Sequence, residues 1–229
     1  MKKKNILWLY LFLLVSMLDI FFTANGKSEL RIYSKPLILI TLWIYFYFNS
    51  IEIKGSLLRK SISAALIFSW MGDVLLIFPN LFLYGLGAFL MAHICYIIGF
   101  KISQTNPFVV GQVNFIRLFF VNLPIYILAA FVYFLINPGL GTMKVPVVIY
   151  LIVIVMMATT ARERYQKTIP ASFWQVFIGA MLFMVSDGIL AINMFFKPFP
   201  ESGVLVMGTY VVAQLLIVMG IVAHFKNKE

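Results

Sequence analysis

Three aspartates lie inside long apolar segments of this chain, and their side chains are the first candidates for chemistry. They are Asp19, Asp73 and Asp187. An ionisable group in the hydrocarbon of a membrane costs roughly 2.5–3.5 kcal/mol on insertion scales, so such a group faces the interior of a helix bundle. We interpret Asp73 and Asp187 as a catalytic pair, with a structural contact between helices as the alternative. For Asp19, which lies nearer the end of its segment, the structural explanation is equally good.

Other polar groups are expected at the same depth as these two aspartates. Asp73 and Asp187 each lie six residues before the end of their segment, which corresponds to about 9 Å along a helix. Lys35 opens another segment on the same side, and Tyr150 lies six residues after the start of a fourth. Four polar groups from four helices therefore converge in one half of the membrane, which predicts a site there.

A helical stripe adds a further face to this predicted site. Gly85, Phe89, His93, Tyr96 and Phe100 follow one another at spacings of three or four residues, so they share one side of a helix. We expect His93 to orient water or substrate, with an ordinary packing or hydrogen-bonding role as the alternative. Further candidates for binding or orienting a substrate are Tyr96, Ser186, Asn193, Tyr210 and Gln214.

The composition requires membrane helices to carry these residues. Of the 229 residues, 62% are hydrophobic and 11% are charged, and the mean hydropathy is +0.99. A soluble domain carries roughly 25% charged residues, and a membrane span needs about 20 apolar residues. We therefore expect an all-α fold, a polytopic transmembrane bundle of about eight helices that forms one integral membrane domain over residues 1–229. The expected spans are residues 6–23, 33–48, 57–78, 81–101, 115–136, 144–161, 171–192 and 204–224.

The net charge of +10 is not arranged for nucleic-acid binding, because the cations cluster beside the apolar spans. In such positions they set the orientation of a membrane protein and contact anionic lipid head groups. Most of the 18 lysines and arginines fall on one side of the membrane if the N-terminus lies inside. We expect both termini to be cytoplasmic, in a bacterial cytoplasmic (inner) membrane, and the first apolar run to be a retained helix rather than a signal peptide.

The two aspartates also belong to a faint internal repeat. The sequence GDVLL at residues 72–76 resembles SDGIL at residues 186–190, and in the segment that follows each, His93 corresponds to Gln214 at a constant spacing of small residues. Segments four apart run in the same direction, so the pattern is typical of a parallel repeat of four plus four helices. Chance recurrence of small residues, which are common in membrane helices, explains it equally well.

These residues carry a resemblance to a known family. The matching features are Gly72-Asp73 with Leu75 and Leu76, the run from Gly85 to His93 with Tyr96, Gly179-Ala180 with Phe183, Ser186-Asp187 and Ala191, and Lys35-Pro36, Tyr150 and the segment from Tyr210 to Gln214. Together they resemble the YhhN-type lysoplasmalogenase family over nearly the whole chain. The resemblance implies hydrolysis of the vinyl ether bond of a lysoplasmalogen, giving a fatty aldehyde and glycerophosphoethanolamine or glycerophosphocholine.

The chemistry that the resemblance implies suits two carboxyl groups. A vinyl ether is cleaved when its alkene carbon is protonated and water captures the resulting oxocarbenium ion, a type of intermediate that glycosidases also handle with two carboxylates. Asp73 and Asp187 are our hypothesis for this pair, without an assignment of which is the acid. His93, Tyr150 and Gln214 would orient water or the phosphodiester, and Lys35 would pair with the phosphate.

Two other functions use similar residues. A proton-coupled transporter would place carboxylates in a pseudo-symmetric bundle. An intramembrane aspartyl protease would also use two aspartates, but Trp70 stands where its motif has a glycine. A metal site formed by His93 and two aspartates is a further alternative to a metal-free site. We expect no cofactor, and we expect a lysophospholipid substrate and membrane lipids as partners, without nucleic acid or an obligate protein partner.

Overall fold

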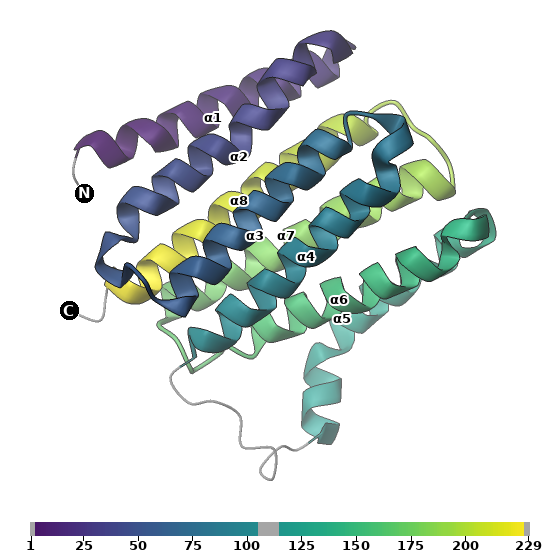
Figure 1. Ribbon diagram of the computed structural model, residues 1–229. Helices are drawn as coiled ribbons and strands as arrows, with labels where there is room; N and C mark the ends of the chain where they lie inside the picture. The colour runs from purple at the N-terminus through teal and green to yellow at the C-terminus, as the bar shows by residue number, and fades with distance from the viewer. Residues whose placement is uncertain (1–2, 105–114, 227–229) are drawn as a thin grey trace.

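The computed structural model describes residues 3–104 and 115–226, which form eight α-helices and no strand (Figure 1). The helices are α1 (Lys3–Ala24), α2 (Ser28–Asn49), α3 (Leu57–Leu75), α4 (Phe82–Ile102), α5 (Phe115–Ile136), α6 (Lys144–Arg162), α7 (Pro170–Phe195) and α8 (Ser202–Lys226). The predicted all-α fold is confirmed, and each of the eight predicted spans falls on one of these helices.

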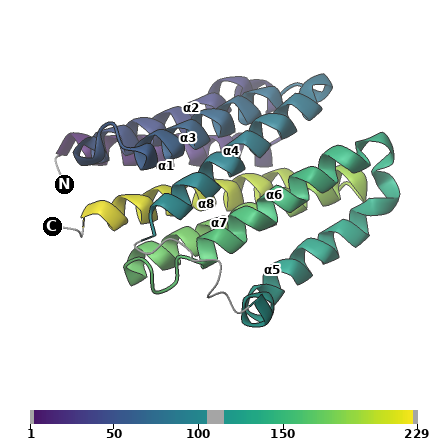
Figure 2. The same ribbon diagram turned by 60° about the horizontal axis from the view of Figure 1, so that its bottom comes forward.

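Six of the described helices are long and apolar enough to cross a membrane, namely α1, α4, α5, α6, α7 and α8. The other two, α2 and α3, include charged residues, among them Arg31, Lys35 and Arg59. They nevertheless lie alongside the apolar helices in both ribbon views (Figures 1 and 2). Because a helix satisfies its own backbone hydrogen bonds, this arrangement suits a chain surrounded by lipid.

The predicted boundaries differ from the structure mainly at charged residues and turns. The second helix begins at Ser28 instead of residue 33, since Arg31 has Asp19 as a carboxylate partner and does not need to lie in a loop. The third helix ends at Leu75 instead of residue 78, followed by a turn and Pro79, before which helical backbone is disfavoured. The seventh helix continues to Phe195, three residues beyond the predicted end.

The helices run side by side, with α1 at one flank of the bundle and α5 at the other (Figure 1). The α7–α8 and α3–α4 pairs pack most extensively. Small residues permit this close approach. A Cβ atom on Gly179 of α7 would lie only 2.8 Å from the carbonyl oxygen of Ala213 in α8, and one on Gly72 would lie 2.6 Å from the Phe89 ring. Gly179 therefore allows α7 and α8 to approach closely.

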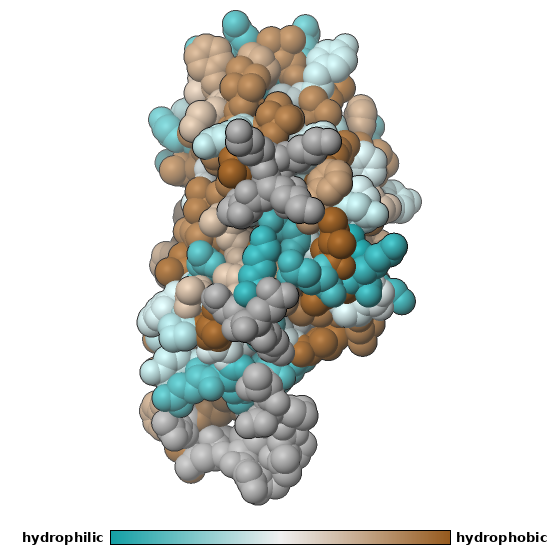
Figure 3. All heavy atoms as spheres, turned by 90° about the vertical axis from the view of Figure 1, so that its left-hand side faces the viewer, coloured by the Kyte–Doolittle hydropathy of each residue, from teal (hydrophilic) through white to brown (hydrophobic). Residues whose placement is uncertain are grey.

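The two ends of the bundle differ in their polar groups. At the end where α1 begins and α8 ends, hydrophilic side chains gather on the surface (Figure 3). Beneath this surface the fully buried Arg164 donates hydrogen bonds to Ser103 Oγ at 2.9 Å and to Ser172 Oγ at 2.7 Å, and Ser172 Oγ donates to the carbonyl of Gly220 at 2.6 Å. Burial lowers the pKa of Arg164 to about 9, which leaves its guanidinium charged at neutral pH. The candidate site lies toward the opposite end.

Candidate active site

Asp73 lies near the end of α3 and is held by one helix on each side. The hydroxyl of Tyr210 in α8 donates a hydrogen bond of 2.7 Å to Asp73 Oδ2. The ammonium of Lys35 in α2 lies 3.7 Å from Asp73 Oδ1, and only 4% of the Asp73 side chain is exposed. Burial of a carboxylate is costly unless a cation and hydrogen bonds accompany it. Lys35 and Tyr210 supply these two kinds of partner to the buried Asp73 carboxyl group.

A second ion pair lies behind this one, at the start of α2. Arg31 is placed one helical turn before Lys35, and its guanidinium lies 3.5 Å from Oδ2 of the fully buried Asp19 in α1. Ser34 donates a hydrogen bond of 2.6 Å to the other carboxylate oxygen of Asp19. The structural interpretation of Asp19 therefore has support: its carboxylate holds Arg31, whose side chain is exposed enough to reach the cavity described below.

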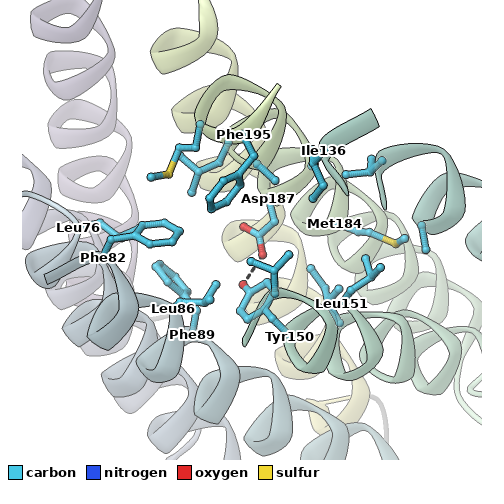
Figure 4. Close-up of a pocket in the computed structure, with 18 residues that line it drawn as sticks. Leu76, Phe82, Leu86, Phe89, Ile136, Tyr150, Leu151, Met184, Asp187 and Phe195 are labelled. Atoms are coloured by element: carbon cyan, nitrogen blue, oxygen red, sulfur yellow. Dashed lines mark hydrogen bonds between the residues drawn. The ribbon is translucent and has the colours of Figure 1, made fainter. Parts of the chain in front are cut away.

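Asp187 in α7 is held by neutral or titratable groups instead of a lysine. The Tyr150 hydroxyl of α6 donates a hydrogen bond to Asp187 Oδ2. His93 Nε2 of α4 lies 2.9 Å from the Tyr150 oxygen and 3.4 Å from Asp187 Oδ2. When the proton is on Nε2, the three side chains form a chain of donors running from His93 through Tyr150 to Asp187. The Asp187 side chain is 18% exposed, and its second oxygen faces the pocket (Figure 4).

Two pockets meet at Asp187. One has a volume of about 720 Å³ and is lined almost entirely by apolar side chains of α4, α5, α6 and α7, with Tyr150 and Asp187 as its polar groups (Figure 4). The other has a volume of about 680 Å³ and contains the charged groups. Its polar lining residues are Arg31, Lys35, Asp73, Ser186, Asp187, Asn193, Ser202 and Tyr210. Phe89 lines both pockets and marks the boundary between them.

The remaining predicted residues support this cavity in different ways. Tyr96 and Gln214 are fully buried and joined by a hydrogen bond of 2.5 Å between the tyrosine hydroxyl and Gln214 Oε1, and neither lines the two pockets. Ser186 donates to the carbonyl of Val206 at 2.9 Å, which joins α7 to α8. The side-chain oxygen of Asn193 accepts a hydrogen bond of 3.1 Å from the backbone of the following loop. The predicted stripe on α4 is confirmed as a buried face.

Sequence reasoning missed Arg31 and the apolar pocket. Arg31 was placed in a loop, although its spacing of four residues from Lys35 was a signal that both lie on one face of a helix. The apolar pocket is formed by side chains of four helices together with Leu76, and it has no motif of its own. Within residues 3–104 and 115–226, no three His, Cys, Asp or Glu side chains come together as metal ligands, so His93 and two aspartates do not form the metal site considered above.

These features define the protein as a helical membrane protein whose cavity has a charged half, an apolar half and a carboxyl group at the junction. Comparison with known proteins then places it more closely. The chain belongs to the YhhN family, whose profile matches residues 30–221. The predicted family resemblance is confirmed. No solved structure matches the chain.

Several curated relatives carry the name lysoplasmalogenase. Lysoplasmalogenase TMEM86B of Sus scrofa is 32% identical over 167 residues, which cover 70% of this chain and 62% of the pig protein. Lysoplasmalogenase TMEM86B of Homo sapiens is 33% identical over 158 residues, covering 69% of this chain and 62% of the human protein. Lysoplasmalogenase of Mycobacterium tuberculosis is 29% identical over 166 residues, covering 71% of this chain and 60% of that protein. The match thus spans less than two thirds of these relatives.

Proposed function

We propose that this protein is a membrane-embedded lysoplasmalogenase, which hydrolyses the vinyl ether bond of an alkenyl glycerophospholipid that has lost its second chain. The name shared by its relatives supports this activity. The observation that carries the proposal is the position of Asp187 at the junction of an apolar and a charged pocket. A lysoplasmalogen has the same division, because its vinyl ether joins a hydrocarbon chain to a polar glycerophosphate.

The two pockets suggest how the substrate lies. The alkenyl chain occupies the pocket lined by residues such as Met184 and Ile154, where burial of each CH₂ group contributes about 0.8 kcal/mol. The glycerophosphate lies in the charged pocket, where Arg31 and Lys35 offer donors to the phosphate. With this orientation the vinyl ether lies beside the free oxygen of Asp187.

The first chemical step is proton transfer to carbon. Asp187 in its protonated form donates a proton to the alkene carbon farther from the ether oxygen, and the neighbouring carbon becomes part of an oxocarbenium ion. Asp187 is placed for this role because its second oxygen faces the apolar pocket in which the alkenyl chain lies. Asp73, ionised beside Lys35, stabilises the positive charge from the polar pocket.

The second step adds water, and the third returns both aspartates to their starting protonation states. Asp73 accepts a proton as water attacks the carbon of the oxocarbenium ion, giving a hemiacetal. The hemiacetal collapses when Asp73 returns that proton to the departing glycerol oxygen and Asp187 takes the hemiacetal hydroxyl proton. The products are a fatty aldehyde and a glycerophospho-head group, and each aspartate ends in the state in which it began.

We also propose that the charged pocket lies toward the outer face of a bacterial cytoplasmic membrane, with both termini in the cytoplasm. The bias of lysines and arginines toward the end where α1 begins supports this orientation. One membrane domain comprises the whole described chain under this proposal, and a lysophospholipid is its substrate. No obligate protein partner is needed, since a single chain supplies every group in the cycle.

Isotope labelling of the product tests the proposed reaction. Purified protein in detergent is incubated with lysoplasmenyl-ethanolamine in D₂O and separately in H₂¹⁸O, and the aldehyde is reduced at once with borohydride to the alcohol, which retains the carbonyl oxygen. We expect one deuterium at the carbon next to the carbonyl and ¹⁸O in the trapped product above a control exchanged without enzyme. Release of the head group without aldehyde, or no product from folded protein, would reject vinyl ether hydrolysis.

A further inference from the structure

A third cavity lies on the side of the bundle, between α4 and α6. It is a groove of about 520 Å³ that takes its lining from one stretch of each helix, residues 83–90 and 145–150. Leu83, Val145 and Ile149 on its rim are exposed by 46%, 68% and 49%. Every side chain that lines the groove is apolar apart from the Tyr150 hydroxyl. In a membrane such a surface faces the hydrocarbon of the lipid.

This groove adjoins the apolar pocket of the site. Leu86 of α4 and Tyr150 of α6 line both cavities, and the two side chains face the apolar pocket in the close-up view (Figure 4). Tyr150 is also the residue that donates a hydrogen bond to Asp187. The inner end of the groove therefore lies one side chain away from the proposed acid.

We propose that this groove, hereafter the α4–α6 portal, is the passage through which the hydrocarbon chain of the substrate moves sideways from the membrane into the active site. The inference rests on the proposed function and adds the route that the substrate takes. Leu86 and Tyr150 form the inner boundary of the portal, and the chain passes between them into the apolar pocket.

The energetics of a single-chain lipid favour this route over one through water. Removing a hydrocarbon chain from the membrane core costs free energy for every CH₂ group, so passage of a long chain through an aqueous opening would be strongly unfavourable. Sideways movement through the α4–α6 portal keeps the chain in apolar surroundings throughout. The head group then follows at the level of the charged pocket, which is in contact with the apolar one at Asp187.

Gly87 provides a way to block the portal. It lies exposed on α4 and lines the groove but not the two pockets of the site. A Cβ atom placed on it would meet no other atom within 4 Å, so a larger side chain extends into the groove without a clash at its base. Gly208 of α8 is the matched control, because a Cβ atom there also meets nothing within 4 Å and the residue lines none of the three cavities.

The experiment compares G87F and G208F in liposomes with two substrates, a long-chain lysoplasmenyl-ethanolamine and a water-soluble analogue with a four-carbon alkenyl chain. We expect G87F to lower kcat/KM for the long-chain lipid about tenfold or more and to leave the short analogue nearly unchanged. G208F should leave both rates close to those of the unmodified protein. An equal fall in kcat/KM for both substrates in G87F, or an unchanged rate with the long-chain lipid, would show that the substrate chain does not enter through the α4–α6 portal.

A second measurement does not depend on turnover. A lysophosphatidylethanolamine that carries a diazirine in its chain is photolysed with the protein in liposomes, and labelled peptides are identified by mass spectrometry. Labelling concentrated on residues 83–90 and 145–150, and reduced in G87F, supports the portal. Labelling equal on all lipid-facing helices overturns it. If the unmodified protein releases no aldehyde from either substrate, the proposed function fails while this labelling still reports on the route.

Discussion

Asp73 and Asp187 lie in similar short sequences in the two halves of the chain, yet they have different partners. Asp73 of α3 is held by Lys35 from α2 and Tyr210 from α8. Asp187 of α7 is held by Tyr150 from α6 and His93 from α4. When helices four apart are treated as equivalent, α2 corresponds to α6 and α8 to α4. Each aspartate thus has one partner from its own half of the chain and one from the other half.

This arrangement is what a parallel repeat of four plus four helices would produce, and it extends the sequence resemblance around the two aspartates to their partners. The difference lies in charge. Asp73 has a lysine of α2 beside it, whereas Asp187 has a tyrosine of α6 and a histidine of α4 beside it and no lysine. Under the proposed mechanism, such unequal partners would give the two carboxyl groups the opposite roles that acid–base catalysis requires.

The largest effect should come from removing either carboxyl group. In D187N the proton donor is lost, and in D73N the ionised partner is lost, so each variant should release aldehyde about 10²–10⁴-fold more slowly. Turnover of lysoplasmenyl-ethanolamine by purified protein measures this, with gel filtration and circular dichroism as controls for folding. Full turnover in either variant would remove that residue from the mechanism.

The ion pair on the Asp73 side should dominate stability. K35M leaves a buried carboxylate without its cation and should lower the free energy of unfolding by about 3–5 kcal/mol. Adding D73N to K35M removes the unpaired charge and should restore most of that loss. Unfolding in mixed detergent micelles measures both variants. A K35M protein as stable as the unmodified one would show that Lys35 does not support Asp73.

The two tyrosines give the closest test of the asymmetry, since each donates a hydrogen bond to one aspartate. Y150F removes the link between His93 and Asp187 and should lower kcat about tenfold, because Asp187 has no cation to hold it in place. Y210F should cost less, because Lys35 still holds Asp73. Y96F, whose hydroxyl contacts Gln214 and neither aspartate, is the control. Equal losses in Y150F and Y210F would contradict the unequal roles.

Much of the fold was predictable because each helix is a long apolar run, whereas the partners in the site depend on lateral packing. The positions of Asp73 and Asp187 at one depth followed from their spacing to the ends of two helices that run in the same direction. Which helix faces which is not encoded in a run of apolar residues, so the pairing of Tyr210 with Asp73 was not predicted. The predicted start of α2 was wrong for a related reason. Arg31 was left outside the predicted span, whereas the carboxylate of Asp19 in α1 lies beside it within the bundle.

The smallest effect on turnover is expected from substitution of Arg31, because this residue is expected to bind the head group in the charged pocket and not to take part in the chemical steps. Its guanidinium faces the charged pocket and is held by Asp19, which lines none of the cavities. If Arg31 contacts the phosphate, R31Q should raise KM for the lysolipid about threefold to tenfold and leave kcat nearly unchanged, since a uniform binding contact affects both ground and transition states. D19N, which removes the group holding Arg31, should shift KM in the same direction and by less. Steady-state kinetics of both variants at several salt concentrations provide the measurement. A fall in kcat with constant KM would instead place Arg31 beside the reacting bond and shift the boundary between the two pockets.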